Sequence, residues 1–240
     1  MLPIRDVNPT RIRPLVTWAI IAVNALVYFG WQPQEDPAAT EFVYERAAIA
    51  CELTTGAPLS LDEINSGRCS DGGEQPHFPG KNVWFSGVVS MFLHGSIAHI
   101  LFNMWSLWIF GNNVEEAFGH LGYALFYLAA GVAATVGFVL VNPELTIPLV
   151  GASGAIAGMM GAYLVLFPRH LVMSLVFFRI VALPAMFFLG IWFLSQFFFN
   201  TEGVAWEAHV AGFAFGALVA LPFRQRLLSR TLAGEHHSLA

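Results

Sequence analysis

A serine and a histidine stand in two segments of this chain that hold few other polar side chains. Ser153 lies in the run GASGAIAG, residues 151–158, and His209 lies in AHVAGFAFG, residues 208–216. A serine hydroxyl is a weak nucleophile until a base takes its proton, and a neutral imidazole accepts a proton near neutral pH. The pair therefore predicts a nucleophile and its general base. The alternative is structural: each side chain could simply bond to a nearby helix carbonyl.

His99 and Asn103 form a second polar pair in an apolar segment. They are four residues apart, so a helix would place them on one face. An imidazole N–H and an Asn amide are suitable donors to a developing oxyanion. No metal site is predicted, because the sequence offers neither an HExxH pattern nor a third ligand at helical spacing. The alternative for this pair is a set of hydrogen bonds between helices.

No carboxylate is placed to complete a triad with Ser153 and His209. The candidates lie near the far end of a helix, in a loop or on another helix face: Glu115, Glu116, Glu144 and Glu207. We therefore expect a dyad, with Glu144 and Glu207 solvated or interfacial.

The composition indicates that the elements carrying these polar residues are membrane-spanning helices. Hydrophobic residues make up 56% of the 240 residues and charged residues 11%, and the mean hydropathy is +0.62. Such a chain is too apolar for a soluble surface. It also has no basic stripe of the kind that binds nucleic acid. We predict an all-α, polytopic membrane protein in contact with the lipid bilayer.

Six apolar runs are candidates to cross a bilayer core about 30 Å thick as helices. The first follows basic residues but has no small-residue cleavage site after it, so it is interpreted as a retained span rather than a signal peptide. Another apolar run, at 171–182, is short and contains Arg179, so it is placed at the membrane interface. The six predicted spans are residues 15–29, 96–111, 121–141, 151–167, 183–199 and 204–223.

These spans define a six-helix domain at 15–223, between an N-terminal segment at 1–14 and a polar tail at 224–240. Three prolines in the N-terminal segment oppose any regular element there. Six spans put both termini on one side, and a cytoplasmic placement agrees with the positive-inside rule. The basic residues then inside are Arg5, Arg11, Arg13, Arg169, Arg179, Arg224, Arg226 and Arg230, eight of the eleven Lys and Arg.

The stretch at 32–82 differs in kind from the spans. It is acidic and contains scattered Pro and Gly, which predicts a soluble extracytoplasmic loop with short helices at 40–50 and 61–66. Both cysteines of the chain, Cys51 and Cys69, lie in it. A disulfide between them and a pair of free thiols are equal alternatives at this point.

The predicted topology brings the polar residues to one depth. The second, fourth and sixth spans all run from outside to inside, and their polar residues lie within roughly 10–15 Å of the outer end. These residues are His99, Asn103, Ser153 and His209. Gly212 and Gly216 form a GxxxG pair below the histidine, a pattern that allows close helix packing. A matching small-residue face on the fourth span could bring the nucleophile and the base into contact.

Three short segments match one known set of motifs. GASG at 151–154 matches a GxSG nucleophile motif, AHVAG at 208–212 a histidine motif, and FLHGSIAHILFN at 92–103 a second-span motif. In this order, on these spans, they give the chain a strong resemblance to the rhomboid family of intramembrane serine proteases. The resemblance covers most of residues 15–223 and implies a rhomboid-like six-helix bundle, of the type found in bacterial plasma membranes.

The resemblance assigns roles to individual residues. It implies Ser153 as nucleophile and His209 as base, with His99, Asn103 and the Ser153 backbone N–H stabilising the oxyanion. Gly151 and Gly154, the glycines of the nucleophile motif, are expected to contact the substrate, and His94 to be structural. It also implies cleavage of transmembrane protein substrates near their extracytoplasmic end, without metal or cofactor. The link 200–203 and the start of the sixth span would lie near a lateral substrate gate.

Two positions depart from the pattern of many relatives. An aromatic residue commonly follows the serine by one turn and packs on the histidine, whereas this chain has Ala157. Some relatives carry Trp-Arg in the first loop, whereas this chain has Trp84 and Phe85. The first departure leaves the orientation of the His209 ring open, and the second leaves open how the loop is anchored.

Two other classes of protein are alternatives to a protease. A non-catalytic rhomboid-like protein would bind transmembrane clients, but such proteins typically lack the serine or the histidine, and both are present here. A transporter using intramembrane histidines would show discontinuous spans and two related halves. Neither feature is clear in this sequence.

Overall fold

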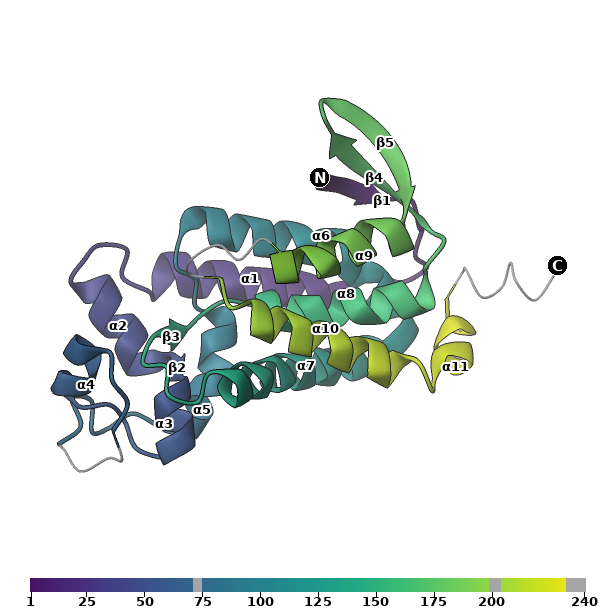
Figure 1. Cartoon of the computed structure of the whole chain (residues 1–240). Helices are drawn as coiled ribbons and strands as arrows, with labels where there is room; N and C mark the ends of the chain where they lie inside the picture. The colour runs from purple at the N-terminus through teal and green to yellow at the C-terminus, as the bar shows by residue number, and fades with distance from the viewer. Residues whose placement is uncertain (71–74, 199–203, 232–240) are drawn as a thin grey trace.

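The computed structural model describes residues 1–70, 75–198 and 204–231. This part of the chain is mostly helical, which confirms an α-helical bundle (Figure 1). An apolar helix occupies each segment predicted as a span. The six helices are α1 (Leu15–Gly30), α6 (Ile97–Phe118), α7 (His120–Val141), α8 (Ser153–Leu166), α9 (Ala185–Phe198) and α10 (Trp206–Ala220).

The six helices differ in whether they are long enough to cross a bilayer. By length and composition, α7 is the one described helix that could cross a bilayer by itself. A second such unit is α6 together with the preceding α5 (Val83–Val89) and the 3-10 turn η1 (Ser90–Phe92), which meet it across a bend of 79°. The other four apolar helices have 14 to 16 residues, or roughly 21–24 Å. Helix length alone therefore defines one or two spans rather than the six predicted.

Helix α8 lies at the centre of the bundle, packed against α6, α7 and α10. Its residues 154–163 are all buried. The segment is apolar on every side and is made largely of small residues, as expected of a helix surrounded by other helices. Its position explains why neighbouring backbones can approach so closely.

Helix α1 is joined to α6 by a buried carboxylate. The first turn of α1 has no side-chain cap of its own, and Glu115 of α6 accepts hydrogen bonds from the backbone N–H groups of Val16 (2.9 Å) and Thr17 (2.8 Å) and from the Thr17 hydroxyl (2.7 Å). The N-terminal N–H groups of a helix have no intrahelical partners, and a negative charge there also complements the helix dipole. Glu115 thus caps α1 from another helix.

A small sheet adds to the helical bundle at the end where α11 (Arg224–Leu228) lies (Figure 1). Strand β4 (Leu171–Val176) pairs antiparallel with β5 (Arg179–Pro184) and with β1 (Leu2–Asp6). The prediction that prolines exclude a regular element from residues 1–14 is wrong, because β1 is an edge strand and an edge tolerates Pro3. The run at 171–182 forms a hairpin, turned at the exposed Phe177 and Phe178.

The N-terminal strand is tied to the bundle by a carboxylate with an unusual pKa. Asp6 Oδ2 accepts hydrogen bonds from Asn113 Nδ2 (2.5 Å) and the Tyr163 hydroxyl (3.0 Å). Burial raises the pKa of Asp6 from 3.8 to about 7. Between these values the unfolded chain has released the proton that the folded chain keeps. Folding stability from this group is therefore fully present below about pH 4 and is lost as the pH rises through about 7.

We expect the thermal midpoint of the detergent-solubilised protein to decrease as the pH is raised from 5 to 8. The decrease should be smaller in Asp6→Asn. The asparagine keeps an oxygen for both donors but cannot ionise, so it removes this source of pH dependence. Differential scanning fluorimetry across that range measures the effect. Equal slopes for wild type and variant would contradict the role of Asp6.

Candidate active site

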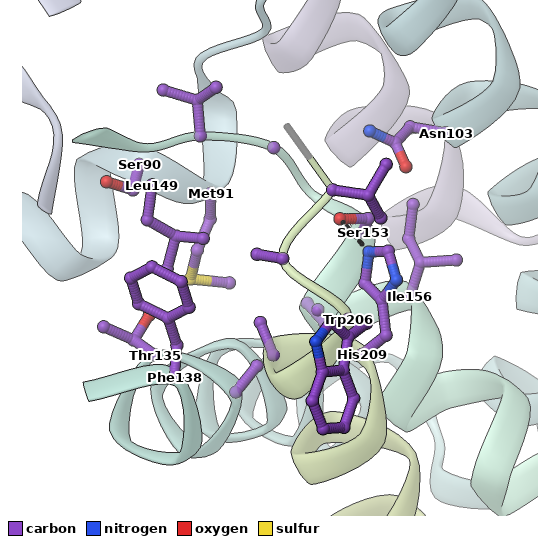
Figure 2. Close-up of a pocket in the computed structure, with 18 of the residues that line it drawn as sticks. Ser90, Met91, Asn103, Thr135, Phe138, Leu149, Ser153, Ile156, Trp206 and His209 are labelled. Atoms are coloured by element: carbon purple, nitrogen blue, oxygen red, sulfur yellow. Dashed lines mark hydrogen bonds between the residues drawn. The ribbon is translucent and has the colours of Figure 1, made fainter. Parts of the chain in front are cut away.

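The Ser153 and His209 side chains meet in the structure. Ser153 is the first residue of α8, His209 lies in the first turn of α10, and the Ser153 Oγ is 2.8 Å from the His209 Nε2 (Figure 2). The contact joins residues 56 positions apart in the chain. Both side chains are half-buried. The imidazole is therefore placed where it can take the hydroxyl proton.

Glycines explain how two helices bring these residues together. A Cβ added to Gly212 would overlap the carbonyl oxygen of Gly154, and one added to Gly216 would overlap that of Gly158. The small-residue face of α8 thus packs directly on the GxxxG face of α10, backbone against backbone. This contact fixes the distance between the two helix N-termini and hence between the serine and the histidine.

Gly151 brings His99 next to the nucleophile. Its φ of +122° favours glycine, and its N–H donates to the Ser90 carbonyl oxygen at 2.9 Å. A Cβ at this position would lie 2.7 Å from both Cε1 and Nε2 of the His99 ring. Glycine therefore serves here in two ways, through its backbone conformation and through the space it leaves for the imidazole.

Asn103 carries a buried donor without a partner. The residue is 6% exposed, and its Nδ2 makes no hydrogen bond with any described residue. Leaving such a group unpaired costs about 1–3 kcal/mol. Asn103 lines the same cavity as Ser153 and His209, and Figure 2 shows it on the side of the cavity where these two residues lie. An oxygen atom bound beside Ser153 is the kind of partner that would satisfy it.

One cavity of about 830 Å³ contains the four polar residues predicted from the sequence. Much of its wall is apolar, with Met91, Phe138, Leu149, Ile156 and Trp206 among the lining residues (Figure 2). It is large enough for several residues of an extended or unwound peptide. Gly151 and Gly154 also line it, so the structure places both glycines where a substrate in this cavity would lie.

The start of α8 adds backbone donors to the cavity. No side chain caps this helix end, so the N–H groups of its first turn, beginning at Ser153, have no side-chain acceptor. Such groups and the helix dipole favour negative charge. The first residues of α8 line the same cavity as Asn103 and His99, whose side chains also carry N–H groups.

Among the described residues, none of the four carboxylates weighed for a triad hydrogen-bonds to the His209 ring, although Glu207 lines the cavity. Glu207 Oε1 accepts a hydrogen bond from Asn142 Nδ2 at 3.0 Å, and Glu144 is exposed in its loop. Glu115 caps α1, and Glu116 accepts the backbone N–H of Arg11 at 2.7 Å.

Gln196, a residue not predicted from the sequence, contacts the other side of the histidine. The His209 Nδ1 is 2.8 Å from the Gln196 Oε1, and the Trp192 ring lies 6.0 Å from the imidazole centroid. Both residues belong to α9, and they surround the ring that Ala157 leaves uncovered on α8. A polar side chain in an apolar segment was the available signal for Gln196.

His94 lies behind His99 and is fully buried. The two rings meet edge to face with centroids 5.1 Å apart. Gln32 holds the His94 backbone from both sides, donating to its carbonyl at 2.7 Å and accepting from its N–H at 3.1 Å. The expected structural role of His94 agrees with these contacts.

The loop at 32–82 supports the segment that leads to Ser153. It contains α2 (Ala38–Arg46), β2 (Ala48–Ile49), α3 (Ala50–Thr55) and α4 (Leu61–Ser66). Strand β2 pairs with β3 (Pro148–Leu149), and the Cys51 N–H donates to the Leu145 carbonyl at 3.0 Å. The helix expected at 61–66 is present, whereas that expected at 40–50 breaks before β2. The loop at 32–82 therefore helps to position residues 145–149, which lead to Ser153.

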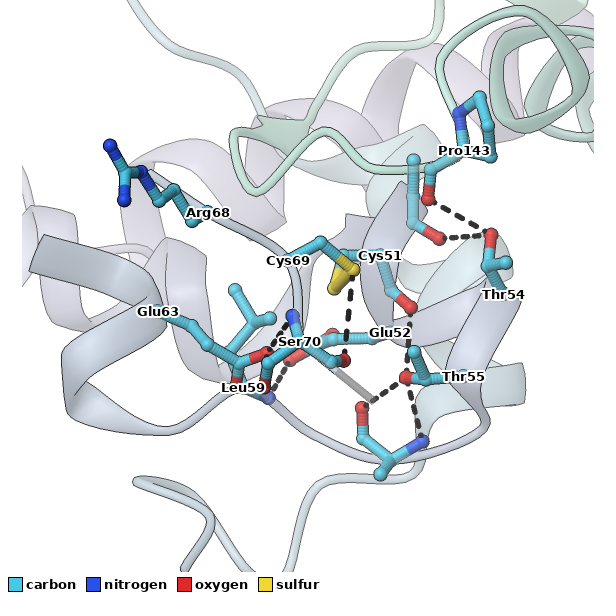
Figure 3. Close-up of a disulfide and its surroundings, with 12 residues drawn as sticks. Cys51, Glu52, Thr54, Thr55, Leu59, Glu63, Arg68, Cys69, Ser70 and Pro143 are labelled. Carbon is cyan, nitrogen blue, oxygen red and sulfur yellow. Dashed lines mark hydrogen bonds between the residues drawn. A yellow bond between two sulfur atoms is a disulfide. The ribbon is translucent and has the colours of Figure 1, made fainter. Parts of the chain in front are cut away.

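The structure joins Cys51 and Cys69 in a disulfide (Figure 3). Among the described residues, the one cluster of three potential metal ligands is formed by these cysteines and Glu63, and the disulfide occupies both sulfurs. A buried ion pair lies in the same loop, with the Lys81 Nζ 2.5 Å from the Glu52 Oε2. These links hold the loop as a folded unit beside β3.

The helical bundle thus brings a serine and a histidine into hydrogen-bond contact inside a largely apolar cavity. A family model described as "Rhomboid domain" matches residues 81–226. The chain belongs to the rhomboid family. Rhomboid family proteins are integral membrane proteins.

Individual relatives support this membership. The chain is 30% identical over 184 residues to "Rhomboid protease GluP" of Bacillus subtilis, a match that covers 72% of this chain and 35% of that protein. It is 35% identical over 91 residues to "Putative rhomboid protease YdcA" of the same organism, covering 37% and 45%. It is 35% identical over 95 residues to "Rhomboid-type serine protease 2" of Emericella nidulans, covering 36% and 18%. The matches span less than half the length of each of these relatives.

Some predicted segments extend outside the described residues, and one of them is the polar tail at 224–240, which is described only to residue 231. The link at 200–203, expected beside a substrate gate, falls in the interval between α9 and residue 204.

Proposed function

We propose that this chain is an intramembrane serine endopeptidase that cleaves transmembrane proteins near the extracytoplasmic face. The observation that carries the proposal is the 2.8 Å contact between Ser153 Oγ and His209 Nε2 within the cavity. Membership of the rhomboid family and relatives named as rhomboid proteases support it. The serine and histidine also distinguish the chain from a client-binding protein without catalytic groups.

The geometry supports an acyl-transfer mechanism in which the His209 imidazole accepts and donates the protons. His209 Nε2 takes the Ser153 proton while Oγ attacks the carbonyl carbon of the scissile bond. The oxygen that gains negative charge receives hydrogen bonds from Asn103 Nδ2, an N–H of the His99 ring and the Ser153 backbone N–H. The imidazolium then gives its proton to the leaving amine as the C–N bond breaks, which leaves the acyl group as an ester on Ser153 Oγ. Water attacks this ester while the imidazole takes its proton, and the imidazolium returns that proton to Ser153 Oγ as the ester bond breaks and the acid product leaves.

The proposed membrane placement follows from charge and from the helix positions. Six spans within residues 15–223 put both termini in the cytoplasm, with the loop at 32–82 outside. Arg11 donates to the Arg230 carbonyl at 2.5 Å, so the N-terminal segment and the end of α11 lie at the same end of the bundle. Ser153, at the start of a helix that runs inward, then lies below the outer surface. A bacterial plasma membrane is the proposed location.

The proposed substrates are membrane proteins with an outer segment that unwinds easily. A nucleophile reached through a cavity can attack only a peptide bond whose backbone is accessible, and a helix hides its carbonyls in hydrogen bonds. The apolar walls suit side chains from a transmembrane segment, and Gly151 and Gly154 leave room for its backbone. The proposed chemistry needs no metal or cofactor.

A fluorophosphonate probe tests the proposal without a known substrate. We expect the purified wild type in detergent to be labelled, and Ser153→Ala and His209→Ala to lose labelling by at least roughly 10³-fold, because nucleophile and base act as a unit. Ser106→Ala is the matched control, since Ser106 is a serine that lines the same cavity. Gel fluorescence and intact mass would measure the modification.

Two outcomes would contradict the proposal. Labelling that persists in Ser153→Ala would show that another residue is the nucleophile. A folded wild type that neither reacts with the probe nor cleaves transmembrane proteins reconstituted with it would favour client binding without catalysis.

A further inference from the structure

We infer that Gln196 is a positioning residue that holds His209 in the tautomer able to accept the Ser153 proton, an inference that rests on the proposed function. The site thus works through a Ser153–His209–Gln196 relay in which the third member is a neutral amide from α9. The inference goes beyond the nucleophile and base by naming what orients the base.

The hydrogen bonds of the glutamine determine which atom faces the histidine. Gln196 Nε2 donates to the Trp192 carbonyl oxygen at 3.1 Å and to the Ser195 hydroxyl at 3.3 Å. The amide nitrogen is thereby directed to acceptors on its own helix, so the Oε1, which only accepts, points to His209 Nδ1 at 2.8 Å. An acceptor at this position requires a proton on Nδ1.

The tautomer set by Gln196 decides what His209 can do for Ser153. A neutral imidazole carries one proton, so a proton on Nδ1 leaves Nε2 with a free lone pair. That lone pair faces the Ser153 Oγ, 2.8 Å away. In the other tautomer, Nε2 would hold a proton and could not take one from the serine.

A neutral amide suits this place in the bundle. An unpaired carboxylate in an apolar interior is costly to bury, whereas an amide whose donors and acceptor are used is not. Trp192 adds a ring beside the imidazole, with an angle of 39° between the planes. With alanine at position 157, α9 rather than α8 provides the groups that orient the base.

The arrangement makes the base depend on the position of α9. The helix is partly free on its outer side, where Ile191 is 50% and Leu194 is 56% exposed. An outward displacement of about 1 Å would lengthen the contact with Nδ1 beyond hydrogen-bond distance. The proton on Nδ1 would then lose its acceptor, and the Nε2 lone pair its fixed direction.

Gln196→Leu and Gln196→Glu separate an acceptor from a packing role. Leucine has a similar size but no acceptor, so the maximal rate of inactivation by the fluorophosphonate, kinact, should fall roughly 10- to 100-fold with KI little changed. Glutamate keeps an acceptor, so it should restore kinact to within several-fold of wild type. Its charge should also move the acid limb of the pH profile of kinact to higher pH, because it stabilises imidazolium.

Leu194→Ala is the control for truncation on the same helix, and it should leave kinact unchanged. Thermal midpoints of all variants show that each is folded. A labelled wild type with an unaffected Gln196→Leu would overturn this inference alone, as would equal losses in the Leu and Glu variants with an unchanged pH profile. A wild type that the probe does not modify would overturn the proposed function itself.

Discussion

Replacing Gly216 with alanine should lower the rate of fluorophosphonate labelling by roughly 100-fold or more, although the residue touches neither the nucleophile nor the base. The added Cβ would overlap the Gly158 carbonyl oxygen and lie 2.9 Å from its Cα. Backbone atoms cannot rotate away as a side chain can, so α10 must move from α8. Overpacking of this kind costs about 1–3 kcal/mol, and a misplacement of 1 Å can reduce catalysis by about 100-fold.

The control for this change is Gly190→Ala. Gly190 is also a helical glycine, but a Cβ there would have no neighbour within 4 Å. The labelling rate and the thermal midpoint of Gly190→Ala should equal those of wild type, whereas both should be lower in Gly216→Ala. If Gly216→Ala retained the wild-type rate, the direct packing of α8 on α10 would not control the distance from Ser153 to His209.

Glu115→Ala should produce the largest loss of stability among the substitutions considered, about 3–5 kcal/mol. The change removes the acceptor of two backbone N–H groups and a hydroxyl at the start of α1, and it leaves Thr17 buried without that partner. Denaturation followed by intrinsic fluorescence in detergent would measure the loss. We also expect faster proteolysis around residues 10–17, because the first turn of α1 is released.

Glu115→Gln provides the graded comparison, since it keeps one acceptor oxygen but loses the charge, and its loss should be intermediate. Glu144→Gln changes an exposed glutamate and should have an effect near zero. Equal stability of Glu115→Ala and wild type would mean that α1 does not depend on the cap from α6.

The parts of the site carried by short motifs were predictable from the sequence. Polar side chains are unusual in apolar segments, so four of them could be singled out: Ser153, His209, His99 and Asn103. In the structure all four line one cavity. The small residues of α8 and the GxxxG pair of α10 also predicted that these two helices pack closely on each other. Their catalytic roles remain predictions until the variants are measured.

Features that depend on distant pairing were not predictable in the same way. Gln196 faces His209 only because α9 packs beside α10, and a single amide among aromatic residues gives no indication of its partner. Strand β1 exists because β4 lies beside it, so local prolines misled the prediction. The helix expected at 40–50 was cut short because Ala48 and Ile49 pair with β3, about 100 residues further on.

The order of the two site residues in the chain has a consequence for synthesis. Ser153 precedes His209 by 56 residues, so at about 5–20 residues per second the nucleophile leaves the ribosome roughly 3–11 seconds before its base. During that interval the glycine face of α8 has no α10 to pack on, and the serine has no imidazole to activate it. Under the proposed mechanism, the serine can be activated only once α10 has been made and has packed on α8. If the proposed function holds, a nascent copy is therefore expected to be inactive until α10 has packed on α8.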